Sequence, residues 1–189
     1  MQHTQHGEKG VTVEISIYAI AIETFVPMLR SLSNVLDKGA DHARANKSDP
    51  GALVNARLAP DMYTLAQQVQ LASDQARDAT ARLSGQEAPQ LENNEKTLEE
   101  LKARIAKTID YVNSVPASAF EAAESRKITI PIPENNMEFE MNGLQLLRDW
   151  ALPHFYFHVV TAYDILRHNG VEIGKRDYLS GVGRYIRQR

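Results

Sequence analysis

The sequence predicts an all-α four-helix bundle with a small β-hairpin between helices three and four. Four long segments repeat apolar residues at steps of three and four, which is the spacing of one helix face. One shorter segment alternates apolar and polar residues, as a half-buried strand does. The chain has 189 residues, of which 43% are hydrophobic and 24% charged, as in one ordinary globular domain.

The first predicted helix runs from about Ser16 to Asn46. Pro27 lies inside it, and because proline lacks an amide N–H and its ring clashes with the preceding turn, we expect the helix to bend or to lose its first turns there. His42 lies beside the apolar stripe near the helix end. It either faces the negative end of the helix dipole or packs partly, with metal binding as the alternative.

Asp49 and Pro50 form the pattern of an N-cap followed by proline at the first helical position, which predicts a short helix over residues 52–58. Beyond Pro60, an alanine-rich stripe predicts the second long helix, which ends at Gly85. Because alanine is small, a neighbouring helix can approach this stripe closely.

The third helix is predicted to begin at an Asn94 cap and to end before Pro116. Its charged face is expected to be exposed to solvent. The residues of that face are Glu95, Lys96, Glu99, Glu100, Lys102, Arg104 and Lys107.

Residues 127–132 and 137–141 predict the two strands of the hairpin, with a turn over Pro133–Asn136. One face of the hairpin is apolar, made by isoleucines on the first strand and by Met137, Phe139 and Met141 on the second. Since two strands alone are marginally stable, that face must lie on the helices or on a second chain.

The fourth helix is predicted to begin with a capping box, in which Asn142 is the cap and Gln145 the third helical residue. Pro153 should interrupt it and free the carbonyl of Asp149. Gly170 should end the helix in a left-handed conformation.

His154 and His158 are the candidate site, because residues four apart on a helix project from one face. A catalytic zinc needs at least three protein ligands, so a third would have to come from the second long helix. Asp61 or Gln68 could supply it, and the set could hold Zn²⁺, Ni²⁺ or Fe²⁺. The alternatives are that Asp61 stabilises a helix N-terminus, that Gln68 is a buried hydrogen-bonded amide, and that the histidines are core residues.

An aromatic cluster surrounds the two histidines. With the nearby proline bends it predicts a pocket for a small apolar ligand, in which we include Trp150, Tyr156 and Gln68.

Composition excludes several classes of function. The chain has no cysteine, which rules out disulfides, thiolate metal ligands and a thiol nucleophile of the protein. A net charge of −3 predicts no nucleic-acid or membrane partner, and the start of the chain lacks the apolar core of a signal peptide, so we expect a cytoplasmic protein.

The ends of the chain differ in composition from the central domain. We predict a disordered extension over residues 1–12, which carries His3 and His6, the bundle domain over 13–180 and a basic tail over 181–189. The basic residues after Gly174 suit a partly ordered surface strap better than an anion site.

Several segments resemble an uncharacterised bacterial family of domains of unknown function, grouped with the DinB/YfiT-like four-helix bundles. The resemblance covers about Val13 to Leu179, and its clearest segments are residues 15–18, 55–62, 68–70, 152–158, 166–171 and 174–178. It implies a DinB-like, often dimeric bundle in a superfamily whose members bind a divalent metal through three histidines and include thiol transferases. His154 and His158 match the two histidines of the last helix, whereas the second-helix histidine has no counterpart here.

Two hypotheses follow. The first is a divalent-metal-dependent, thiol-transferase-like enzyme with an altered ligand set of His154, His158 and Asp61. The second is a non-catalytic homodimer that binds a small ligand or takes part in a stress response.

Overall fold

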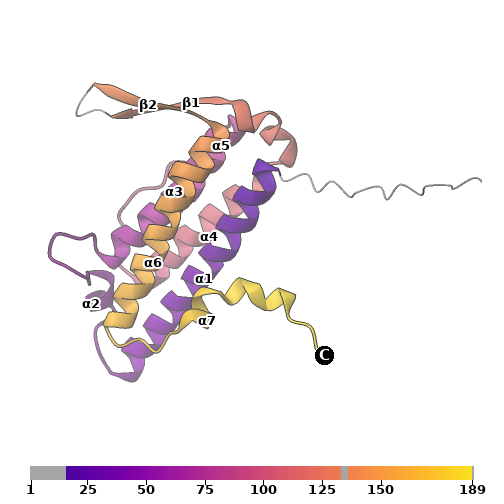
Figure 1. Ribbon diagram of the computed structural model, residues 1–189. Helices are drawn as coiled ribbons and strands as arrows, with labels where there is room; N and C mark the ends of the chain where they lie inside the picture. Colours follow the sequence, from indigo (N-terminus) through magenta and orange to yellow (C-terminus); the bar gives the residue numbers. More distant parts are fainter. Residues whose placement is uncertain (1–15, 133–135, 189) are drawn as a thin grey trace, which may run out of the picture.

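The computed structural model describes residues 16–132 and 136–188. Four long helices form the bundle (Figure 1): α1 (Ile17–Ala45), α3 (Leu65–Ser84), α4 (Leu98–Ser114) and α6 (Leu152–His168). Helix α1 packs beside α4 and α6, and α3 packs beside the same two helices, so α1 and α3 lie diagonally across the bundle. The predicted all-α bundle with a small hairpin is confirmed.

Helix α1 is continuous through Pro27, and the expected loss of its first turns does not occur. Ser16 caps it by accepting a hydrogen bond from the amide of Ala19 at 3.0 Å. Burial of Phe25 and Leu29 on either side of the proline offsets the missing hydrogen bond. By length and composition α1 could cross a membrane, but its apolar side chains form the bundle core, which accounts for its composition.

Helix α2 (Pro50–Val54) begins as predicted, with the Asp49 carboxylate accepting from Gly51, but it ends earlier than expected. Helix α3 then begins at Leu65, where Thr64 and Gln67 form a capping box, and ends at Gly85 with φ +72°. The capping box was not predicted, and it sets the start of α3 beyond Asp61.

Helix α4 begins three residues later than predicted. Thr97 and Glu100, not Asn94, form its N-terminal capping box. Asn94 instead lies in the linker between α3 and α4, where its side chain donates to Glu92 at 2.8 Å.

The predicted solvent exposure of Arg104 is wrong. Its side chain is buried and joins α4 to α3 through Asp74 at 2.7 Å and to the linker through Glu95 at 3.0 Å. Burial raises the pKa of the Asp74 carboxyl, against the opposite effect of Arg104 and Arg77. The sequence held a signal for this, because Arg104 lies at steps of three and four from Leu101 and Thr108, on the apolar stripe itself.

The hairpin consists of β1 (Lys127–Ile132) and β2 (Met137–Asn142), which are antiparallel with Ile130 opposite Phe139. Two 3₁₀ turns, Ala117–Phe120 and Ala123–Ser125, lead into it. Phe139 packs on Trp150, with ring centroids 4.9 Å apart, whereas Met137 is 55% exposed. The apolar face therefore lies only partly on the helices. Of the predicted turn, residues 133–135 lie outside the described residues, as do His3 and His6.

The interruption that Pro153 predicts in the fourth helix is present as a π-helical turn, which is wider than an α-helical one. The predicted capping box begins α5 (Gly143–Gln145), and a π-helical turn, η4 (Leu146–Ala151), leads into α6. The amide of Leu152 donates to the carbonyl of Leu147, five residues back. The helix ends in a Schellman motif, with Gly170 at φ +87° and Val171 donating to Leu166 at 3.1 Å.

The C-terminal segment crosses α1, as Figure 1 shows in yellow. It comprises α7 (Lys175–Tyr178) and η5 (Ser180–Tyr185). Asp177 pairs with Lys38 of α1 at 2.6 Å, and the Ser180 hydroxyl is 2.6 Å from that of Ser31. The segment is thus an ordered strap over the part that the structure describes.

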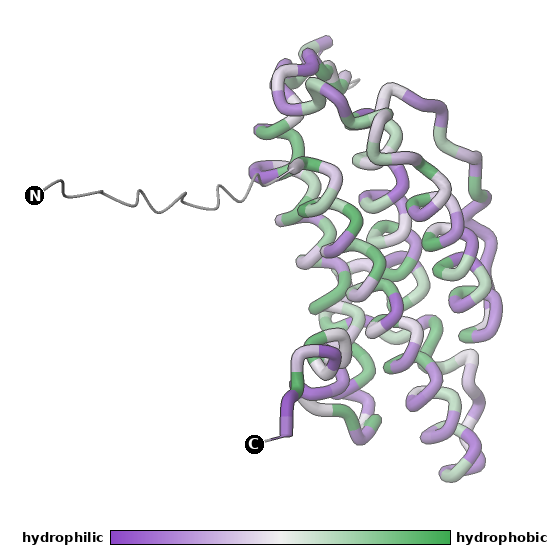
Figure 2. The backbone as a smooth tube through the Cα atoms, turned by 90° about the vertical axis from the view of Figure 1, so that its right-hand side faces the viewer, coloured by the Kyte–Doolittle hydropathy of each residue, from purple (hydrophilic) through white to green (hydrophobic). Residues whose placement is uncertain are grey.

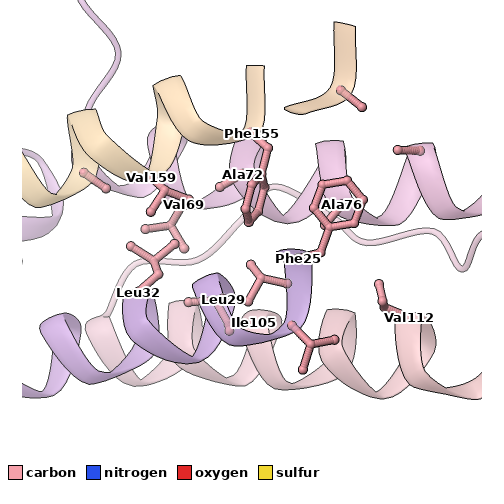
Figure 3. Close-up of a cluster of buried hydrophobic side chains, with 14 of the residues drawn as sticks. Phe25, Leu29, Leu32, Val69, Ala72, Ala76, Ile105, Val112, Phe155 and Val159 are labelled. Carbon is pink, nitrogen blue, oxygen red and sulfur yellow. The ribbon is translucent and has the colours of Figure 1, made fainter. Parts of the chain in front are cut away.

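The core lies between the four long helices. Figure 3 shows Phe25 of α1 and Phe155 of α6 pointing toward each other, with ring centroids 5.0 Å apart in an edge-to-face arrangement. Leu29, Ala72 and Ile105 surround them. Figure 2 shows apolar and polar residues alternating within the turns of the helices, as expected for helices with one buried face.

Gly143 allows the hairpin to join α5, since a Cβ atom there would lie 1.9 Å from the carbonyl oxygen of Ala123. We predict that Gly143→Ala lowers the free energy of unfolding by about 1–3 kcal/mol, because backbone must move to make room. Urea denaturation measures this. Gly174→Ala is the control, since nothing lies within 4 Å of a Cβ there; equal effects of the two substitutions would contradict the prediction.

Candidate functional site

His158 of α6 and Gln68 of α3 form a buried polar pair. The Nδ1 atom of His158 lies 2.8 Å from Oε1 of Gln68. His158 is 9% exposed and Gln68 is 1% exposed. The prediction that Gln68 is a buried, hydrogen-bonded amide is confirmed, and its partner is one of the two candidate histidines.

The neighbours of Gln68 fix which ring nitrogen of His158 carries the proton. The amide nitrogen of Gln68 donates to the carbonyl of Tyr63 at 3.5 Å, which directs the amide oxygen toward His158. Since an amide oxygen only accepts, Nδ1 of His158 must donate. The Nε2 atom of neutral His158 therefore keeps its lone pair.

The surroundings of His158 also keep it neutral. Burial, and to a smaller extent the nearby His154 imidazole, lower its pKa from 6.5 to about 4. At neutral pH the ring is therefore an uncharged group with a fixed tautomer, which suits a structural hydrogen bond or a metal ligand.

His154 lies one turn before His158 and is half-buried. Its ring meets Trp150 edge-on, with centroids 4.5 Å apart, and Trp150 in turn contacts Phe139 of the hairpin. His154 therefore links the site to the hairpin through aromatic packing, while His158 links it to α3.

Asp61 does not join the two histidines. It is exposed and lies in a turn before α3, because the helix begins only at Leu65. Within residues 16–132 and 136–188, no three His, Asp or Glu side chains lie close enough together to hold a metal ion. The described residues supply two imidazoles, so they do not complete a three-ligand catalytic zinc site.

The three residues predicted to line one pocket, Trp150, Tyr156 and Gln68, do not line the same cleft. Trp150 lines a cleft of about 140 Å³ between α3, the hairpin and η4, with Arg82, Ile130 and Leu146. The side chain of Gln68 is hydrogen-bonded to His158, and Tyr156 is 38% exposed on the outer side of α6.

An apolar surface on the outer side of α6 was missed by sequence reasoning. Phe157 is 57% exposed, and Tyr156 and Val160 are 38% exposed each. Tyr63, in the segment before α3, is 55% exposed, and its carbonyl is bonded to Gln68, which places it near His158. The signal in the sequence was that residues 156, 157 and 160 lie opposite the buried residues 155, 159 and 162.

Comparison with known proteins identifies the family. Residues 17–179 match the family described as Domain of unknown function (DUF1993). The chain belongs to this family. It is also similar to a DinB family member protein from Shewanella denitrificans, whose crystal structure was determined at 1.83 Å resolution, with a TM-score of 0.80 and 39% sequence identity. The match covers 86% of this chain and 91% of that one. No curated protein matches.

These comparisons confirm the resemblance to the DinB-like bundles. In this family member, Gln68 supplies the contact from the second long helix to the histidine pair of the last one. That contact uses Nδ1 of His158 and leaves Nε2 available.

We predict that the low pKa of His158 makes stability depend on pH. Its folded-state pKa of about 4 lies below the unfolded value of 6.5, so the unfolded state binds more protons between these values. The stability is fully present above pH 6.5 and is lost as the pH falls toward 4, by up to about 3 kcal/mol.

Urea denaturation at about pH 7 and about pH 5 measures this loss. His158→Gln should reduce the pH dependence, whereas His168→Gln, which changes an exposed histidine, should not. A titration of His158 followed by NMR that gives a pKa near 6.5 would contradict the prediction.

Proposed function

We propose that this member of the DUF1993 family is a non-catalytic homodimeric binding protein. The observation that carries the proposal is the exposed apolar surface of Tyr156, Phe157 and Val160 on α6. Monomeric proteins rarely leave neighbouring large apolar side chains in water, and such surfaces are typical of interfaces.

The charges at the ends of this surface suit a two-fold dimer. Asp149 and Arg167 are both exposed and lie about equally far before and after residue 158. Asp149 pairs with its neighbour Arg148 at 2.6 Å within one chain. If two copies of α6 pack antiparallel, Arg167 of the second copy approaches this Arg148–Asp149 pair, and the apolar residues meet at the centre. Such a self-complementary contact is the usual form of a homodimer interface.

The cleft beside Trp150 is where we propose that a small ligand enters. Ile130 and Leu146 give it apolar walls, and Arg82 and Asp78 place charges at its rim. A few polar groups around apolar walls are typical of ligand sites, and the volume of about 140 Å³ restricts the ligand to a small molecule.

We predict that light scattering gives a mass of twice the 21.2 kDa chain. The double substitution Phe157→Ser and Val160→Ser should give the mass of one chain, because it removes the apolar contact while both side chains face solvent in the folded monomer. Met137→Ser is the matched control, since Met137 is similarly exposed but lies on the hairpin. A wild-type mass of one chain would disprove the dimer.

The second candidate is a divalent-metal-dependent, thiol-transferase-like enzyme. The specific observation in its favour is that Gln68 holds Nδ1 of His158 and orients the ring, in the way that a hydrogen-bonded partner orients a metal-binding histidine, while Nε2 has no hydrogen-bond partner among the described residues. His154 would be the second ligand. The described residues offer no third one in reach.

Elemental analysis of protein produced without a His-tag separates the two candidates. We predict well under one divalent ion per chain, because two imidazoles bind zinc more weakly than the three or four ligands of known sites. A stoichiometric ion that is lost in His158→Ala and kept in His168→Ala would instead establish the metal-dependent candidate.

A further inference from the structure

The C-terminal strap carries the two most exposed large apolar side chains of the described residues, together with a third exposed one. Ile186 is 76% exposed, Tyr185 63% and Val182 54%. Three such residues within five positions are more than scattered surface residues, and the strap that carries them lies beside α1 (Figure 1).

Contacts with α1 hold the strap in this position. Asp177 pairs with Lys38 at 2.6 Å, and the hydroxyl of Ser180 is 2.6 Å from that of Ser31. Gly181 lies against Pro27, since a Cβ atom on it would be 3.1 Å from the proline Cβ. The backbone on the inner side is therefore fixed, and the apolar side chains beyond it remain in solvent.

The strap is also locally basic, although the chain has a net charge of −3. Its one acid, Asp177, is paired with Lys38. Its exposed cations are Lys175, Arg176, Arg184 and Arg187.

Two of these cations and several apolar residues of the strap line the same hollow on the surface. An open hollow of about 520 Å³ is lined by Lys175 and Arg176 together with Leu179, Val182 and Ile186. Cations beside exposed apolar side chains match the interface of a bilayer, where lipid phosphates lie above hydrocarbon. Tyr185 suits the same depth, because tyrosine has an apolar ring and a polar hydroxyl.

A second copy of the chain is a poorer fit to this surface. In a two-fold contact the same patch faces itself, so Arg184 and Arg187 of each copy would lie opposite the same cations of the other. Like charges brought together in an interface cost free energy. The charge of the strap therefore favours an anionic occupant.

We propose that the strap, Lys175–Arg187, docks this protein on the surface of a bilayer that contains anionic phospholipids. The cations contact the lipid phosphates, and Val182, Tyr185 and Ile186 enter the boundary between headgroups and acyl chains. The proposal is independent of the dimer and of any metal.

Vesicle flotation tests the proposal with full-length protein. Vesicles of phosphatidylcholine alone are compared with vesicles that also contain phosphatidylglycerol, at low and high salt. The protein should float with the anionic vesicles only, and salt should weaken the binding. Arg184→Gln with Arg187→Gln should lower the partition coefficient by about tenfold or more, as should Val182→Ser with Ile186→Ser.

Matched controls separate the strap from the rest of the surface. Lys96→Gln with Lys107→Gln removes two exposed cations from α4 and its linker, and Met137→Ser removes an exposed apolar side chain from the hairpin. Both should float like the unchanged protein, and circular dichroism should show that every variant is folded.

Three outcomes would overturn the proposal. They are an absence of binding to anionic vesicles at low salt, equal binding to neutral and anionic vesicles, and binding that the strap substitutions leave unchanged. A fall in the mass measured by light scattering, in the strap variants alone and without any effect on flotation, would assign the strap to a contact between copies instead.

Discussion

The close approach of α3 and α6 is the constraint on which the rest of the structure depends. These two helices share the most extensive contact of the bundle, and the inner side of α3 includes the small residues Ala72, Ala76 and Ala79. Small side chains let the backbones approach, so Phe155 of α6 can reach across to Phe25 of α1. The same approach brings His158 within hydrogen-bonding distance of Gln68.

Burial at this contact gives His158 its chemical character. A charged imidazole would lose its hydration there, so the pKa falls to about 4 and the ring is neutral at physiological pH. Gln68 then fixes the proton on Nδ1, because its own amide nitrogen is directed toward Tyr63. The result is a rigid cross-link between two helices that also leaves one ring nitrogen with a lone pair. The structural role is in place in this chain, and a metal site would need ligands beyond the two imidazoles.

The surfaces outside the bundle divide into two of different chemistry. The outer side of α6 is apolar, which suits contact with a copy of itself. The C-terminal strap combines apolar side chains with cations of one sign, which suits an anionic surface. The strap packs on α1 through Lys38 and Ser31, and it also contacts α6, where the rings of Tyr163 and Tyr178 have centroids 6.2 Å apart.

The sequence by itself determined the helices, the hairpin and most of their ends, because these depend on local patterns: the three-and-four spacing of apolar residues, the caps at Asp49 and Asn142, and the glycines at 85 and 170. It also singled out His158 and Gln68, each from its place on a helix face. Only the tertiary structure decided which side chains meet. Asp61 lies outside α3, because the capping box at Thr64 sets the start of that helix. Arg104 is buried against Asp74, and the aromatic residues after Trp150 are divided between the core and the surface. Spacing along one helix fixes the direction of a side chain relative to its own axis, whereas its partners depend on how the helices are rotated and placed against each other.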